Sequence, residues 1–318
     1  MPIKATRQIW HDGALVPWQE ATVHVLAHGL HYGSSVFEGI RAYSTPRGPA
    51  LFRLHDHLRR LYDSARIYRI TIPFSRSVLE RACREVVRAN DLDSAYVRPI
   101  VYRGYGSLDV APGEDTPIGV SIAAVEWGAY LGAAGLESGV DVGVSSWPRW
   151  APHVLPAGAK AGGQYLSSQL VAMEAKRHGY AEGITLDAAG HLGEGAGENL
   201  FLARDGVIHT PPLASSILPG ITRDTVITLA RDLGYQVLEH ALPRDSLYVA
   251  DEVFLTGTAA EVTPVRSVDG IPVGSGARGP ITTVIQRAFF ALVRGGAQDR
   301  HGWLSFVASE PRQERAVS

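Results

Sequence analysis

The sequence is poor in cysteine and lysine, and it lacks any long apolar run. Cys83 is the single cysteine among 318 residues, which excludes an internal disulfide and a cysteine-rich zinc site. No run of 18 apolar residues occurs, and the first residues, MPIKATRQIW, contain no apolar stretch typical of a secretion signal. These absences argue against a secreted or membrane-spanning protein and predict a cytoplasmic enzyme.

The sequence also has no excess of either charge. Lysine and arginine number 30 and aspartate and glutamate 32, giving a net charge of -2, so nucleic acid or an anionic membrane is not expected as the main partner. Neither GxSxG nor GxxxxGK[ST] occurs, which argues against a hydrolase nucleophile turn and a P-loop. GSGARG at 274–279 matches a dinucleotide motif literally, but Pro280 follows at once and the remaining chain is too short for the required unit.

Histidines form two close pairs that could bind a metal. These are His28 with His31, and His55 with His57. Neither pair has the spacing or the partners of a known zinc motif, so no metal site is predicted.

The composition is that of a globular protein, 45% hydrophobic and 19% charged, and at this length one core usually divides into two. We predict an α+β or α/β protein with an N-terminal domain at 1–126, a glycine-rich linker at 127–138, a larger domain at 139–306 and a mobile tail at 307–318. Apolar periodicity predicts helices over 55–68, 75–89, 165–176, 220–233 and 281–293. Strands are expected as a hairpin within 1–20 and over 96–102, 118–125, 140–145, 183–186, 200–203 and 253–255, with Pro99 marking an edge or bulged strand.

Lysine occurs only three times, so each occurrence requires an explanation. Lys4 lies in the N-terminal segment, and Lys176 suits the end of a predicted helix, where a cation is favoured. Lys160 stands among small residues in PAGAKAGGQY, on neither a charged face nor an obvious helix end. A lysine that condenses with an aldehyde must be a free amine, and small neighbours allow a flat cofactor to approach the backbone. The alternative is a surface lysine in a flexible loop.

Three further segments could complete a cofactor site. GEGAGEN at 193–199 places Glu194 on a tight turn, where a carboxylate could pair with a pyridine nitrogen and keep the ring electron-poor. LPGITRD at 218–224 feeds a predicted helix N-terminus, which favours phosphate, although an ordinary helix capped by Thr222 would look the same. TGTAA at 256–260 is a small polar turn that could hold a phosphate or carboxylate, or be a plain turn. Together these features predict a pyridoxal phosphate site.

The same segments resemble a known family. KAGGQYLSSQLVAMEAKRHGYAEGITLD, EGAGENLF, LPGITRD and EVFLTGTAAEVTPV are similar to signature stretches of the fold-type IV pyridoxal phosphate transaminases. HYGSSVFEGIRAY, HLRRL, YVRP and WGAYLG resemble the bacterial branched-chain amino acid aminotransferases in particular. The similarity runs in order through the chain to about residue 306. It implies a fold-type IV fold with the site at the domain interface.

The resemblance implies a role for each matching residue. Lys160 would be the catalytic residue that holds pyridoxal 5'-phosphate and then moves the proton. The implied cofactor-binding residues are Arg60, Lys160, Tyr165, Glu194, Leu218, Ile221, Thr222, Gly257 and Thr258. The implied substrate-binding residues are Tyr32, Phe37, Tyr96, Arg98, Trp127, Tyr130, Thr258, Ala259 and Ala260. Arg98 could pair with the side-chain carboxylate of glutamate and lie along the apolar wall otherwise, or it could form a salt bridge that closes the domains.

The implied activity is transfer of the amino group of L-leucine, L-isoleucine or L-valine to 2-oxoglutarate by a ping-pong mechanism. Tyr32 would reach the pocket of a neighbouring subunit, so the resemblance implies a homodimer or a higher homo-oligomer. Asp109 departs from the family, where a small residue is expected in YGSLDVAPG, and this leaves the substrate range open. The alternatives within the fold are a D-amino acid transaminase and an aminodeoxychorismate lyase. Outside it, a cofactor-binding protein without turnover and a metal hydrolase remain.

Overall fold

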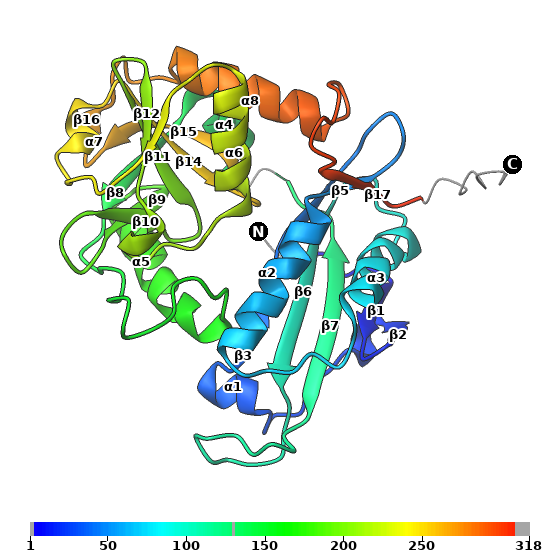
Figure 1. Cartoon of the computed structure of the whole chain (residues 1–318). Coiled ribbons are helices and arrows are strands. Elements are labelled where there is room, and N and C mark those ends of the chain that lie inside the picture. Colours follow the sequence, from blue (N-terminus) through cyan, green and yellow to red (C-terminus); the bar gives the residue numbers. More distant parts are fainter. Residues whose placement is uncertain (1–2, 129–130, 309–318) are drawn as a thin grey trace, which may run out of the picture.

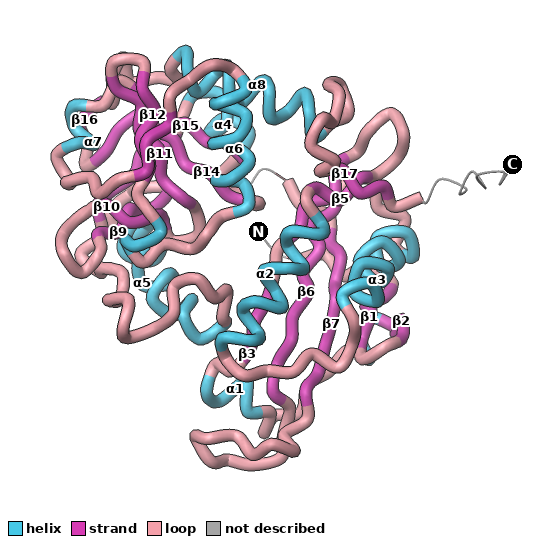
Figure 2. The backbone as a smooth tube through the Cα atoms, viewed as in Figure 1, coloured by secondary structure: helices cyan, strands magenta, loops and turns pink. Residues whose placement is uncertain are grey.

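The computed structural model describes residues 3–128 and 131–308, which form two β-sheets side by side, each covered by helices (Figure 1; Figure 2). The first sheet has the order β17-β5-β4-β6-β7-β1-β2, with β3 also on β6, and all its pairings are antiparallel. Its strands are β1 (Gln8–His11), β2 (Ala14–Pro17), β3 (Ser35–Phe37), β4 (Ile40–Tyr43), β5 (Ala50–Phe52), β6 (Ala95–Arg103), β7 (Ile118–Val125) and β17 (Leu304–Phe306). Short helices α1 (His28–Tyr32) and η1 (Trp18–Glu20) precede β3.

Two amphipathic helices cover this first sheet. They are α2 (Leu54–Ile67) and α3 (Arg76–Ala89). Leu58, Leu61 and Ala65 of α2 form one buried stripe, as their spacing predicts. The Ser75 hydroxyl accepts a hydrogen bond from the Val78 amide and caps α3, which confirms the predicted start of this helix.

The second sheet is mixed and has the order β10-β9-β8-β15-β14-β11-β12-β13, with β16 on β15. Its strands are β8 (Val140–Val144), β9 (Glu182–Leu186), β10 (Leu192–Gly195), β11 (Asn199–Arg204), β12 (Val207–Thr210), β13 (Val237–Glu239), β14 (Glu252–Gly257), β15 (Glu261–Val268) and β16 (Ile271–Pro272). The helices beside it are α4 (Ala133–Ser138), η2 (Gly162–Gln164), α5 (Tyr165–Arg177), η3 (Leu213–Ser215), α6 (Ile221–Asp232), α7 (Ser246–Val249) and α8 (Pro280–Val293). β10 also pairs with β11, so the strand order closes on itself and encloses an apolar core.

The structure corrects several details of the expected organisation. β6 is not an edge strand, because β7 pairs along one side and β3 and β4 along the other. Pro99 is tolerated there because it lies opposite the break between β3 and β4, where the Glu38 amide donates to the Pro99 carbonyl. The expected linker at 127–138 contains α4, which packs on β15.

The end of the described chain also differs from the expectation. Residues 304–306, predicted in the C-terminal domain, form β17 and pair with β5 of the first sheet. Val307, predicted in the mobile tail, is buried and its amide donates to the Pro49 carbonyl. The tail residues 309–318 lie outside the described part of the chain. Among the described residues, none of the helices has the length and apolar character needed to span a bilayer.

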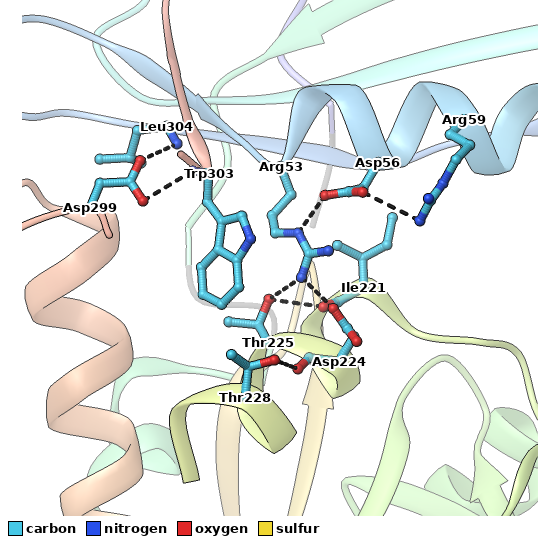
Figure 3. A network of polar contacts seen from close by, with 10 residues as sticks. All are labelled: Arg53, Asp56, Arg59, Ile221, Asp224, Thr225, Thr228, Asp299, Trp303 and Leu304. Atoms are coloured by element: carbon cyan, nitrogen blue, oxygen red, sulfur yellow. Dashed lines mark hydrogen bonds and ion pairs between the residues drawn. The ribbon is translucent and has the colours of Figure 1, made fainter. Parts of the chain in front are cut away.

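A buried arginine joins α2 to α6. Arg53, at the start of α2, donates to Asp56 and Asp224 at 2.6 Å each, and to the Thr225 hydroxyl at 3.2 Å (Figure 3). Its guanidinium also stacks over the Trp303 ring at 4.8 Å. This network fixes α6, which packs on β14 of the second sheet, relative to α2 and the C-terminal segment.

Candidate active site

Lys160 lies in a loop that is attached to the first sheet. Ala161 forms an antiparallel bridge with Val36, the Phe37 amide donates to the Lys160 carbonyl at 3.0 Å, and the Lys160 amide donates to the Ser64 hydroxyl at 2.9 Å. The small neighbours Gly162 and Gly163 serve this attachment. A Cβ on Gly33 would lie 2.6 Å from the Gly163 Cα, so the two segments can approach only as glycines.

The Lys160 amine is directed at Tyr165. Its Nζ lies 2.5 Å from the Tyr165 hydroxyl and 5.0 Å from the centroids of the Phe37 and Tyr165 rings. The side chain is half-buried. A positioned amine beside a phenol, in a partly dry setting, can form a covalent bond to an aldehyde and can carry a proton.

Glu194 is a buried acid held by an arginine that the sequence analysis missed. Arg149 forms an ion pair with Glu194 at 2.7 Å, and the Asn199 side-chain amide and the Leu218 backbone amide each donate to Glu194 at 3.0 Å. Burial raises the pKa of the Glu194 carboxyl, and the Arg149 charge opposes that rise. The Arg149 guanidinium also stacks on the Trp150 ring at 3.9 Å. The acid therefore has a fixed orientation at the cavity wall.

A second buried network surrounds Arg60. Its guanidinium donates to both oxygens of Glu38, at 2.6 and 2.9 Å, and to the Pro219 carbonyl at 2.9 Å. His57 lies 2.7 Å from Glu38, which is fully buried. Burial alone would raise the pKa of Glu38, but the Arg60 charge and His57 outweigh it and hold the pKa well below its usual range. Arg60 is thereby locked in place at the cavity with its charge intact.

Two turns contribute backbone donors. α6 begins at Ile221, and Gly220 is its N-cap with no side-chain cap, so Thr222 is not the cap residue. A Cβ on Gly220 would lie 1.8 Å from the Asn199 side-chain oxygen, which explains the glycine. In the other turn, the buried Thr256 hydroxyl has no hydrogen-bond partner among the described residues. A buried polar atom without a partner in a cavity wall is the feature expected where a ligand oxygen binds.

An aromatic wall closes the opposite side. Tyr96 stacks on Trp127 with ring centroids 5.0 Å apart, and a Cβ on Gly39 would lie 1.8 Å from the Tyr96 hydroxyl. The Arg98 guanidinium lies over the Phe37 and Tyr96 rings at 4.8 and 5.1 Å. It forms no ion pair with an acid in the part of the chain described, so a salt bridge that closes the domains is not observed.

These groups meet in one cavity of about 250 Å³ between the two sheets. The predicted site residues that line it are Phe37, Arg60, Tyr96, Arg98, Trp127, Lys160, Tyr165, Glu194, Leu218, Ile221, Thr222, Gly257, Thr258 and Ala259. Ala260 is buried beside the lining, and its carbonyl accepts from the Thr263 hydroxyl. Tyr32 does not line this cavity: it is 44% exposed on α1 and donates to the Leu108 carbonyl. Tyr130 lies outside the described residues.

The paired histidines take part in other contacts. His57 binds Glu38, and His55 lies 3.1 Å from Glu80. His28 contacts the Ser34 hydroxyl and the Asp109 carbonyl, and His31 contacts the Val25 carbonyl. No group of three possible metal ligands comes together within residues 3–128 and 131–308.

The cavity fits pyridoxal phosphate. It offers an amine, a buried acid, the locked cation Arg60 and the donors of the α6 N-terminus. Thr256, whose buried hydroxyl has no partner among the described residues, also lines it. The family model described as "Amino-transferase class IV" matches residues 35–268. The chain belongs to the class IV aminotransferases. It is therefore a transaminase that uses pyridoxal phosphate, and its fold is the fold-type IV fold that the sequence motifs predict.

Named relatives agree with this assignment. The chain is 56% identical to the branched-chain-amino-acid aminotransferase of Escherichia coli K12 over 307 residues, which cover 96% of this chain and 99% of that one. The crystal structure of the Escherichia coli branched-chain amino acid aminotransferase superimposes with a TM-score of 0.94, covering 96% of this chain and all of that chain at 56% identity. The branched-chain amino acid aminotransferase from Thermobaculum terrenum, in its PLP-form, gives a TM-score of 0.89 at 35% identity and covers 96% of this chain and 99% of that one.

Sequence reasoning missed several residues of the site. Arg149 has already been described, and buried Arg41 is the other clear case. It donates to the carbonyls of Ala259, Trp127 and Gly128 and so ties the turn after β14 to the chain that leaves β7. A charged residue within the otherwise apolar strand β4 was the signal that could have revealed it. The other lining residues not predicted are Gly39, Trp150, Ala157, Ala159, Gln164, Ser168, Ala196, Gly197, Glu198, Asn199, Gly220 and Thr256.

Proposed function

We propose that this transaminase moves the amino group of L-leucine, L-isoleucine or L-valine to 2-oxoglutarate, in two half-reactions at the same cavity. The observation that carries the proposal is Arg98, whose guanidinium lies on an aromatic wall without an acidic partner among the described residues. Such a wall can accept a branched apolar side chain, and a guanidinium on it can bind the second carboxylate of 2-oxoglutarate. The relatives named above carry branched-chain activity in their names.

The roles of the chain's own residues follow from the geometry. When bound, pyridoxal phosphate supplies an electron-withdrawing ring that stabilises the charge left at the substrate Cα after deprotonation. Lys160 would hold the cofactor and, as the free amine, would take the Cα proton and return it to C4′ of the cofactor. Tyr165 orients that amine at 2.5 Å. Glu194 would bind the ring nitrogen, and Arg149 keeps its carboxylate oriented.

The phosphate and the substrate carboxylate would each bind to their own set of donors in the cavity. Arg60 and the Ile221 and Thr222 amides would bind the phosphate, together with Thr258. Leu218 would pack on the ring and Gly257 would let the turn approach it closely. The Ala259 and Ala260 amides, with Tyr96, would receive the substrate α-carboxylate. The arrangement presents cations and donors to each anion and leaves the apolar wall for the side chain.

We also propose a homodimer, with the cytoplasm as its location. Leu30, Leu108 and Val110 are large apolar side chains that are 64%, 59% and 77% exposed near Tyr32. A cluster of this kind is expected to be covered, and a second copy placed over it would bring Tyr32 toward the partner's cavity. Asp109 lies in the same loop, where the Ser107 hydroxyl donates to its carboxylate at 2.7 Å. Cys83, a free and buried thiol, suits a reducing compartment.

The proposal is tested by a survey of half-reactions. Purified holoenzyme is mixed with L-leucine, L-isoleucine, L-valine, D-leucine, an aromatic amino acid and an amine, and the change in cofactor absorbance is followed. We expect rapid conversion with the three L-branched-chain donors and regeneration by 2-oxoglutarate. Conversion by D-leucine alone would favour a D-amino acid transaminase, and release of a product without regeneration by a 2-oxo acid would favour a lyase.

Replacing the wall arginine separates the two halves of the reaction. Arg98→Ala should slow the half-reaction of 2-oxoglutarate more than that of L-leucine, because only the former needs a cation in the side-chain pocket. Loss of a charge-assisted hydrogen bond of about 1.5–3 kcal/mol corresponds to a ten- to hundredfold selective effect. Single-turnover rates measure both halves. Arg59→Ala, an exposed arginine on α2, is the control. Equal losses in both halves would contradict the shared pocket.

A further inference from the structure

Two buried acids lie at the cavity wall, and neither has a role in the reaction described above. Glu182 begins β9 and Glu198 lies in the turn between β10 and β11, and their side chains are 2% and 4% exposed. Neither forms an ion pair with any cation in the described part of the chain. Two negative charges in such a dry setting would be costly, so their protonation state requires an explanation.

The pair binds two consecutive amides of one turn. Glu182 accepts from the amides of Gly183 and Ala196 at 2.7 and 3.2 Å, and Glu198 accepts from the Gly197 amide at 3.1 Å. The two carboxyl groups are also close enough for a hydrogen bond between them, which lowers the pKa of Glu182 and raises that of Glu198. Ionised carboxylates only accept, so one of the two must be protonated to donate. Burial, and then the negative charges of Glu182 and Glu194, raises the pKa of Glu198 well above its usual range.

The pair holds a turn that forms part of the cavity. Ala196, Gly197 and Glu198 line the cavity, and the carboxyl groups bind the Ala196 and Gly197 amides from behind. The turn also packs on the turn at Thr256–Ala259. The two are so close that a Cβ on Gly257 would lie 3.4 Å from the Gly197 carbonyl oxygen and 3.5 Å from the Glu198 Cγ. A shift of the first turn would therefore displace the second, which we assign to phosphate and substrate carboxylate.

We propose that Glu182 and Glu198 share a single proton and act as a positioning pair, which fixes the turn at 195–198 and keeps a second negative charge away from a cavity that binds anions. The charged groups that face Glu198 are Glu182 from β9 and Glu194 from β10. The turn at 256–259 brings no charged side chain toward it. Loss of the shared proton therefore leaves like charges adjacent, with no cation to compensate.

The charge of the pair makes cofactor binding depend on pH. Burial also raises the pKa of Glu182, and between that pKa and the higher pKa of Glu198 the pair carries one negative charge and the turn is held in place. As the pH rises through that value both acids ionise, they repel each other, and an added negative charge lies beside the phosphate and carboxylate positions. Affinity for pyridoxal phosphate should fall by up to about tenfold per pH unit above that point, which is the limit for a single linked proton.

The test compares variants that keep the hydrogen bond with one that removes it. The dissociation constant of pyridoxal phosphate is measured across a pH series for the wild type and for Glu198→Gln, Glu182→Gln and Glu198→Ala, with the exposed Glu20→Gln as control. In either glutamine variant an amide donates in place of the shared proton, so the alkaline decline assigned to the pair should disappear. Glu198→Ala should bind more weakly at every pH, and Glu20→Gln should follow the wild type.

Infrared spectroscopy tests the proton itself. The wild-type protein at neutral pH should show the carbonyl band of a protonated carboxyl group, and this band should vanish in Glu198→Gln while remaining in Glu20→Gln. A purely structural role for the pair would leave the pH profile of Glu198→Gln unchanged. The proposal is overturned by that result or by the absence of the band. Both readouts are independent of the amino-acid substrate, so they stand even if the proposed branched-chain specificity fails.

Discussion

Lys160→Ala is expected to abolish transamination and to remove the absorbance band of the lysine-bound cofactor. The amine at 2.5 Å from the Tyr165 hydroxyl is the group that we assign both to holding the cofactor and to moving the substrate proton. Loss of general acid–base catalysis alone lowers a rate by about 10²–10⁴-fold, and loss of the covalent link adds to this. Single-turnover assays with L-leucine, together with absorbance spectra of the purified variant, measure both effects.

The scarcity of lysine makes this experiment unusually clear. Among the side chains, only those of Lys4, Lys160 and Lys176 could carry a label after borohydride reduction of the holoenzyme, and each lies in a different part of the chain. Lys176→Ala is the matched control, because Lys176 is exposed in the last turn of α5. It should retain the band, the label and normal turnover. An added small primary amine should partly restore proton transfer in Lys160→Ala. A label on another lysine, or unimpaired turnover in Lys160→Ala, would refute the assignment.

The sequence could predict those parts of the site that carry their own local signal. Lys160 stands out because lysine is rare and its neighbours are small, and the α6 N-terminus stands out because Pro219 and Gly220 precede an apolar-periodic segment. Helices α2, α3 and α8 follow from periodicity that extends over several turns. In these places the information lies within a few consecutive residues, and the structure has the elements where the pattern indicates them.

The remaining features depend on contacts between distant segments. Arg149 lies between β8 and η2 in a long irregular segment without periodicity, and its partner Glu194 comes 45 residues later. β17 is three residues long and pairs with β5, about 250 residues earlier, so no local pattern could place it in the first sheet. Buried Glu38 and Arg41 in an apolar segment did offer a signal, since such charges are almost always paired, but it could not identify the partners.

Glu194→Gln should lower turnover by about 10²–10³-fold, the typical effect of removing one precisely placed electrostatic partner. The substitution keeps the shape of the side chain but removes the charge that would keep the ring nitrogen protonated. Cofactor binding should largely persist, because Lys160, Arg60 and the α6 N-terminus are unaltered. Measured kcat and cofactor content separate the two effects. Turnover close to that of the wild type would show that the acid on this turn has no part in the chemistry.

Arg149 allows loss of charge at the ring to be distinguished from loss of folding. Glu194→Gln leaves a guanidinium that is only 7% exposed without its anion, and an unpaired buried charge can cost about 3–5 kcal/mol of stability. Arg149→Met in the same chain removes that cost, so the double variant should recover stability in urea unfolding but not turnover. Arg149→Met alone keeps the acid and removes the charge that opposes the effect of burial, so the pKa of Glu194 should rise further. The acid would then ionise only at higher pH, so the acidic limb of the pH profile of kcat should move to higher pH. If Arg149 only supported the fold, Arg149→Met would lower stability and leave that limb in place.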